Sequence, residues 1–200
     1  MTGTDLNALI SSRICHDLIS PLGAIGNGVE LLTMTGQGNS PEIALIAESV
    51  ENANARIRFF RIAFGAARPD VEIAQSEVQN VLRDCFRANR TSIKWTVEGV
   101  LTRADVKLVF LIVQCLENAL PWGGQITVSR SGANWKLDAK GEKIKATQAV
   151  WRLITERAEQ AEPHEVDASD VHFALVGGAA DNAGRRVATF FSDTQVTVTF

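Results

Sequence analysis

The segment Cys15-His16-Asp17-Leu18-Ile19-Ser20-Pro21 lies inside a long run in which apolar residues recur every three or four positions. That period is typical of an amphipathic helix, so the sequence predicts a helix from about residue 5 to residue 35. Within it an imidazole stands beside a carboxylate, and a proline follows one turn later. A proline inside a helix removes a backbone hydrogen bond and costs about 3 kcal/mol, which indicates a local requirement at this point.

A second helix is predicted from about residue 41 to residue 67. Gly36 suits a C-terminal cap of the first helix, Ser40 can cap the next N-terminus, and Pro41 fits the first helical position. Apolar residues of the second helix follow the a and d positions of a heptad, at Ile43, Ile46, Val50, Ala53, Ile57, Phe60 and Phe64. A lone hairpin cannot bury such a seam. We expect either two copies to form a four-helix bundle or the seam to pack on the rest of the same chain.

The segment Arg68-Pro69-Asp70 indicates a linker, because the residue before a proline is pushed out of helical geometry. We expect two domains, residues 1–68 and residues 69–200. In the second, a capping-box pattern at Ser76 and Gln79 predicts a helix to about residue 89. Further helices are predicted near 104–120, 147–161 and 168–182, and strands near 93–97, 126–128, 135–137 and in a terminal hairpin over 186–200. The predicted fold class is α+β, a helical hairpin followed by an α/β sandwich.

Composition narrows the functional classes. The 200 residues are 46% hydrophobic and 22% charged, which is ordinary for a globular protein. A net charge of −3 disfavours binding to nucleic acid or to an anionic membrane surface, and no run of about 18 apolar residues predicts a membrane span. The three cysteines are widely spaced in apolar surroundings, which favours reduced thiols. We therefore expect a cytoplasmic protein that binds neither nucleic acid nor membrane.

On a helical projection of about 100° per residue, an apolar stripe lies roughly opposite His16. The stripe consists of Ile10, Ile14, Leu18, Leu22, Ile25, Val29 and Leu32. We therefore expect His16 to point outward, on a face of mostly small or polar residues. That face and its borders form the candidate partner-binding surface, made of Leu9, Ser12, Arg13, Ile19, Ser20, Gly23 and Asn27.

The chemistry of His16 favours phosphate transfer over the alternative of a plain surface histidine. An imidazole has an unperturbed pKa near 6.5, so at neutral pH one ring nitrogen carries a lone pair that can attack phosphorus. Asp17 can accept the proton of the other ring nitrogen and stabilise the charge that develops on the ring. The resulting phosphoramidate is labile and can pass its phosphoryl group to an aspartate. We identify His16 as the candidate phosphoacceptor and Asp17 as the residue that orients or assists it.

The order of His16, Asp17 and Pro21 resembles the H-box of histidine kinases and dimeric histidine phosphotransferases, in which an acidic residue follows the histidine and a proline lies four residues further on. The elements expected after Pro69 resemble the Bergerat-class ATP-binding domain that follows this hairpin in sensor kinases. Within it, residues 110–129 are similar to the N-box helix and the Gly-Gly entry to the next strand.

Three nucleotide-binding elements depart from the kinase pattern. Gln114 replaces the first N-box asparagine, although Asn118 fits the second. In the adenine-binding turn Gly141 fits, but Asp138 lies one position away from the expected aspartate, and in a strand its side chain then points to the opposite face. Residues 160–169 contain no glycine to hold phosphates on backbone amides. These departures argue against nucleotide binding.

The whole chain is similar to the ChpT type of histidine phosphotransferase. The resemblance implies a homodimer that accepts a phosphoryl group on His16 from the receiver domain of a hybrid histidine kinase and passes it to receiver domains of response regulators. It implies no metal or cofactor held by this chain, with Mg²⁺ supplied by the receiver. Two alternatives stay open: an ATP-dependent sensor histidine kinase with diverged motifs, and a dimeric adaptor that binds receivers without accepting phosphate.

Overall fold

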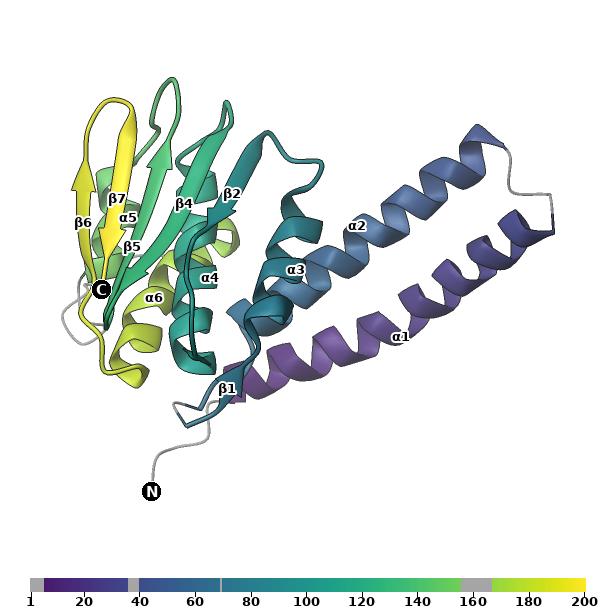
Figure 1. Ribbon diagram of the computed structural model, residues 1–200, viewed down its shortest axis with the longest axis horizontal. Helices are drawn as coiled ribbons and strands as arrows, with labels where there is room; N and C mark the ends of the chain where they lie inside the picture. The colour runs from purple at the N-terminus through teal and green to yellow at the C-terminus, as the bar shows by residue number, and fades with distance from the viewer. Residues whose placement is uncertain (1–5, 36–39, 69, 156–166) are drawn as a thin grey trace. The chain divides into compact units, whose positions relative to one another are not determined.

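The structure is a computed structural model that describes residues 6–35, 40–68, 70–155 and 167–200. The chain divides into two compact units, Met1–Ala66 and Ala67–Phe200. The first is helical and the second contains a mixed sheet with helices (Figure 1). The predicted α+β class is therefore confirmed.

The first unit is a hairpin of two helices that lie side by side (Figure 1). They are α1 (Leu6–Met34) and α2 (Pro41–Ala63), and α2 ends earlier than predicted, with Phe64 as its C-terminal cap. The predicted N-terminal cap is confirmed, because the Ile43 amide donates to the Ser40 hydroxyl oxygen at 3.3 Å and Pro41 follows Ser40. The predicted Gly36 cap lies outside the described residues.

The apolar stripe of α1 is only partly covered. Val29 is buried and Leu22 is half-buried, whereas the other members stay largely exposed: Ile10 57%, Ile14 53%, Leu18 47%, Ile25 49% and Leu32 40%. We call these five residues the hairpin stripe. On α2, Leu45 and Ile46 are exposed as well. In the described part of the chain no helix is long and apolar enough to cross a bilayer.

The second unit contains a five-stranded sheet in the order β2-β4-β5-β7-β6. Its strands are β2 (Thr91–Trp95), β4 (Gly124–Ser131), β5 (Asn134–Lys140), β6 (Ala188–Phe191) and β7 (Gln195–Thr199). β2 and β4 pair in parallel, and the other neighbours are antiparallel. A separate antiparallel pair joins β1 (Glu72–Ile73) to β3 (Leu101–Thr102).

Helices cover one face of the sheet (Figure 1). They are α3 (Gln75–Phe86), α4 (Arg103–Asn118), α5 (Gln148–Thr155) and α6 (Val171–Asn182), the last preceded by a 3-10 turn at Ala168–Asp170. Ile126, Leu137 and Val196 alternate with polar neighbours and are fully buried, as expected for strands with one covered face. Helix α4 is central, since most of its residues are buried. The unit is a two-layer α/β sandwich.

Two local predictions need correction. The capping box at Ser76 and Gln79 is wrong, because α3 begins at Gln75 after Ala74, which makes no side-chain cap bond. The backbone before the helix is instead set by tertiary pairing, since Glu72 pairs with Thr102 across β1 and β3. α3 also ends at Phe86 and not near residue 89. The helix predicted over 147–161 is seen as α5, and the rest of that prediction lies outside the described residues.

A buried ion pair joins α4 to the segment that leads into β6. Arg185 donates from Nε and from one terminal guanidinium nitrogen to the two carboxylate oxygens of Asp105, both at 2.9 Å. Its other terminal nitrogen donates to the Ala133 carbonyl oxygen at 2.8 Å. Asp105 is only 5% exposed, so its charge depends on this bidentate partner for compensation.

Candidate functional site

His16 lies on α1 with its ring in solvent, and its side chain is 81% exposed. Its Nδ1 is 3.3 Å from Oδ1 of Asp17, so the two neighbouring side chains reach each other along the helix. Arg13, one turn earlier, donates from Nε to the other oxygen of Asp17 at 2.8 Å. The imidazole, the carboxylate and the guanidinium thus form a short chain of contacts on the helix surface, which we call the His16 triad.

The contacts of Asp17 decide which nitrogen of His16 carries a proton. Hydrogen bonds from His16 and then from Arg13 lower the pKa of the Asp17 carboxyl, which is therefore ionised at neutral pH. An ionised carboxylate can only accept, so Nδ1 of His16 must be the donor. In the neutral ring the lone pair then lies on Nε2. The contact with Asp17 thus leaves Nε2 of the exposed ring for nucleophilic attack.

Pro21 and Gly23 leave the surface beside His16 open. Pro21 lies inside α1 and has no backbone N–H, so it cannot donate to the carbonyl oxygen of Asp17 four residues earlier. Gly23 lies about two turns after His16, and a Cβ built there would meet no atom within 4 Å beyond the adjacent residues and the nearby backbone of its own helix. Internal packing of the hairpin therefore does not require glycine at this position. The face carries free space above the backbone that another molecule can occupy.

The other residues predicted for the partner surface differ in exposure. Leu9 is 46% exposed, and Ser20 and Asn27 are exposed as well. Ser12 and Ile19 are half-buried, and the Ser12 hydroxyl donates to the Ala8 carbonyl oxygen at 2.9 Å. Arg13, predicted as a partner contact, stays a prediction in that role, and the structure adds that its exposed side chain pairs with Asp17. Its spacing of four residues from Asp17 was the available signal, because such pairs meet on one helix face.

The residue before His16 faces the other way. Cys15 is 7% exposed, and burial raises the pKa of its thiol, although Arg61 opposes the shift. It therefore stays protonated at neutral pH and does not compete with the imidazole as a nucleophile. All three cysteines are free, as the sequence predicted.

Comparison with known proteins identifies the family. A family described as "Histidine phosphotransferase C-terminal domain" matches residues 75–195. The protein phosphotransferase ChpT of Brucella abortus (strain 2308) is 35% identical over 193 residues, which cover 94% of this chain and 90% of that protein. The chain belongs to the histidine phosphotransferase family. It is a phosphorelay histidine phosphotransferase, and its partners are those of a two-component phosphorelay.

One solved structure agrees with this family assignment. The structure titled "1.7 Angstrom Structure of a Bacterial Phosphotransferase" aligns with this histidine phosphotransferase with a TM-score of 0.70 and 28% identity, over 100% of this chain and 98% of the other. The histidine kinase AdeS of Acinetobacter baumannii aligns with a TM-score of 0.44 and 11% identity, over 92% of this chain and 95% of the other.

The kinase-like positions of the phosphotransferase's second unit differ in their surroundings. Asn118 is exposed at the end of α4, while Gln114 is half-buried and its Oε1 has no hydrogen-bond partner in the described structure. At Gly141 a Cβ would lie 2.7 Å from Leu120 Cδ2 and 3.0 Å from the Gly123 carbonyl oxygen. A larger residue there would crowd Leu120 and the Gly123 backbone, so glycine favours the close approach of two segments at this position.

Asp138 points away from the helices, as the strand register predicted. Its neighbours Leu137 and Ala139 are fully buried, whereas Asp138 is half-buried on the other face. Thr197 donates to its carboxylate at 2.6 Å, and the Lys136 ammonium lies 2.7 Å from it. Burial raises the pKa of Asp138, but these contacts and one from Gln195 outweigh burial and lower it. The Asp138 carboxylate is thus held by neighbouring strand residues on the face of the sheet that the helices do not cover.

His172 gives the second unit a pH-dependent stability. It is 8% exposed, and burial lowers the pKa of its ring against the opposing charge of Asp170. The unfolded chain therefore binds more protons than the folded one at pH values between the folded pKa and about 6.5. The free energy of unfolding is therefore highest above about pH 6.5, and it falls below that pH by up to about 1.4 kcal/mol per pH unit.

The variant His172→Phe tests this pH dependence by denaturant unfolding at pH 7.5 and pH 5.5. Between these two pH values its free energy of unfolding should fall less than that of wild type, and equal losses would contradict the role of His172. The other histidine outside α1, His164, lies outside the described residues.

Proposed function

We propose that His16 accepts a phosphoryl group from the aspartyl phosphate of a hybrid kinase's receiver domain and donates it to receiver domains of response regulators. The observation that carries this proposal is the exposed imidazole whose Nδ1 lies against Asp17, because that contact leaves the Nε2 lone pair facing solvent. Nε2 attacks phosphorus, the bond from phosphorus to the donor's aspartyl oxygen breaks, and the donor carboxylate leaves. Nδ1 keeps its proton, and Asp17 stabilises the positive charge that forms on the ring. The reverse sequence passes the group onward.

The face around His16 supplies the docking surface for the receiver. Ser20, Gly23 and Asn27 are small or polar, and Leu9 adds exposed apolar area at one end. The one carboxylate of the His16 triad, Asp17, is already engaged by Arg13 and His16, so the ligands for Mg²⁺ come from the receiver. Free thiols favour a cytoplasmic location, where receiver domains are found.

The protein works as a homodimer. The hairpin stripe repeats at helical spacing along α1, and its five members are 40% to 57% exposed in one chain. A second copy related by a two-fold axis can cover this stripe with its own and complete a four-helix bundle. Because His16 lies roughly opposite the stripe, both copies keep their imidazoles outside the bundle.

The phosphoryl group comes from another protein and not from ATP. Gln114 and Asp138 stand where a kinase would use an asparagine and near where it would use its adenine-binding aspartate, and Asp138 is turned to the opposite face of the sheet. Incubation with ATP labelled at the γ-phosphate should leave the protein unlabelled, whereas a receiver domain phosphorylated on aspartate should label it. Labelling by ATP alone would instead establish a kinase, and labelling by neither would leave a receiver-binding adaptor.

Replacing Asp17 by asparagine tests the assisting role of the carboxylate. Asp17→Asn removes the charge that balances the ring, so we expect the rate of phosphoryl transfer at saturating receiver to fall by about 10²-fold. Binding of the receiver should change little, since the side chain keeps its size. Rapid-quench transfer assays measure the rate, with Glu48→Gln on α2 as a matched loss of one exposed carboxylate. A variant as fast as Glu48→Gln would remove Asp17 from the mechanism.

A further inference from the structure

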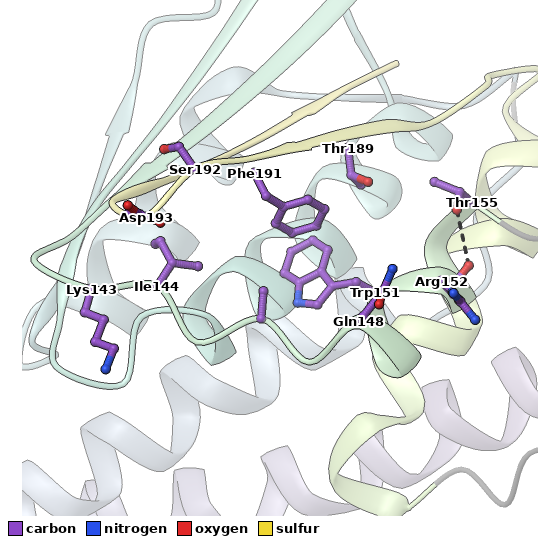
Figure 2. Close-up of a pocket in the computed structure, with 11 residues that line it drawn as sticks. Lys143, Ile144, Gln148, Trp151, Arg152, Thr155, Thr189, Phe191, Ser192 and Asp193 are labelled. Atoms are coloured by element: carbon purple, nitrogen blue, oxygen red, sulfur yellow. Dashed lines mark hydrogen bonds between the residues drawn. The ribbon is translucent and has the colours of Figure 1, made fainter.

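The second unit contains a cavity of about 680 Å³ that the phosphorelay reaction does not use (Figure 2). It lies between the loop after β5, helix α5 and the β6–β7 hairpin. Among the described residues that line it, none belongs to α4, so it is separate from the kinase-like positions Gln114 and Asn118. Cavities that bind small molecules usually measure about 300 to 1,000 Å³. The size is therefore right for a ligand of one or two rings.

The middle of the cavity is aromatic. Trp151 and Phe191 meet edge to face with ring centroids 5.2 Å apart, and Figure 2 shows both rings at its centre. Trp151 also meets Phe173 at 5.3 Å and is only 4% exposed, so the core fixes the indole. Phe191 is 48% exposed, so its ring still has surface to offer. A flat apolar group can bury that surface against a rigid partner.

Backbone hydrogen bonds hold the walls in place. In the loop after β5, the Gly141 amide donates to the Thr194 carbonyl oxygen at 3.1 Å and the Ile144 amide to the Asp193 carbonyl oxygen at 3.2 Å. The Lys145 amide donates to the Ala119 carbonyl oxygen at 3.0 Å. The loop is thus tied both to the β6–β7 turn and to the end of α4. The cavity is formed before any ligand arrives, which lowers the entropic cost of binding.

The two ends of the cavity differ in charge. One end contains a cation, Lys143, and an anion, Asp193, so the positive and negative charges offset each other (Figure 2). The other end contains Arg152 with Thr189 and Thr155. The guanidinium of Arg152 has no acidic partner among the described residues. Among the described residues the Arg152 end therefore carries a positive charge with no acidic partner, beside the Thr189 hydroxyl, whereas the Thr155 hydroxyl donates to the Arg152 carbonyl oxygen at 3.3 Å. An exposed guanidinium next to a hydroxyl suits an anion.

We propose that this cavity binds a small organic anion, with a flat apolar body against Trp151 and Phe191 and its acidic group toward Arg152. The proposal does not depend on the role of His16. It adds a small-molecule site that the proposed transfer between proteins does not use.

The four tryptophans give a direct reporter of binding. In full-length protein labelled with ¹⁵N-tryptophan, we expect 2-naphthoate to shift the indole N–H signal of Trp151 saturably, with a Kd on the order of 1 mM or lower. The signals of Trp95 and Trp135, which pack against each other elsewhere in the core, should not move. Single Trp→Phe variants assign the signals. A Trp151 signal that stays in place, or one that shifts without saturating, would overturn the proposal.

Matched variants test the orientation of the anion. Arg152→Gln should weaken 2-naphthoate binding at least about fivefold, whereas Lys143→Gln, the same charge change at the other end, should weaken it less than about twofold. Neutral 2-naphthalenemethanol should bind wild type at least about fivefold more weakly than 2-naphthoate does. Equal affinities for the two probes, or equal effects of the two variants, would overturn the assignment of the acidic group to Arg152.

Discussion

His16→Ala should lower the rate of phosphoryl transfer from a phosphorylated receiver domain by at least about 10³-fold, to the background of the assay. The variant removes the only nucleophile in the His16 triad, because Arg13 is a cation and Asp17 is held by hydrogen bonds on both oxygens. The fold should be unaffected, since the ring is 81% exposed and its one described hydrogen bond is to Asp17 on the helix surface. Transfer is measured by the loss of label from the receiver and its gain by this protein.

Two controls separate this result from a general effect of substitution and from labelling elsewhere. Ser49→Ala removes an exposed hydroxyl on α2, outside the predicted partner surface, and it should be labelled like wild type. Label on wild type should be lost in acid and kept in base, as expected for a phosphoramidate and not for a phosphoserine. Labelling of His16→Ala at the wild-type rate would show that the phosphoryl group rests on another residue.

Ile14→Glu should convert the proposed homodimer to monomers, weakening the association of the two chains at least about 100-fold. Ile14 belongs to the hairpin stripe and is 53% exposed in one chain, so a two-fold symmetric dimer would bury two new carboxylates at once. Sedimentation velocity across a range of protein concentrations measures the change. Leu31→Glu is the matched control, because Leu31 is on the same helix and 62% exposed but lies off the stripe. A monomeric wild type, or an Ile14→Glu variant that sediments as a dimer, would contradict the bundle.

The hairpin and its histidine could be predicted from the sequence because their signals are local. Ser40 and Pro41 define the start of α2 through bonds within one turn, and the helical period alone places His16 opposite the apolar stripe. The strand alternation likewise placed Asp138 on the face away from the helices. Each of these inferences uses residues only a few positions apart, for which chain geometry leaves few choices.

The features that could not be predicted depend on residues distant in sequence. β2 pairs with β4 in parallel, with Ile93 opposite Ile126, and periodicity within either strand says nothing about its neighbour. The ion pair of Asp105 and Arg185 joins positions 80 residues apart. The start of α3 was misplaced for the same reason, since the β1–β3 pairing overrides the local capping pattern.

Within the candidate site, the sequence predicted His16, Asp17 and a partner contact at Arg13, and these roles stay predictions. It did not predict that Arg13 donates to the Asp17 carboxylate at 2.8 Å. The cavity beside Trp151 was also missed, because its lining comes from segments up to about 50 residues apart that only the folded sheet brings together.

The central claim is that the phosphoryl group passes through His16, and locating that group on the chain tests it most directly. The protein is mixed briefly with a phosphorylated receiver, digested at alkaline pH and sequenced by tandem mass spectrometry. We predict one phosphoryl group, on the peptide that contains His16 and on the histidine itself. Phosphate found on any other residue, with His16 unmodified while transfer proceeds, would contradict the mechanism.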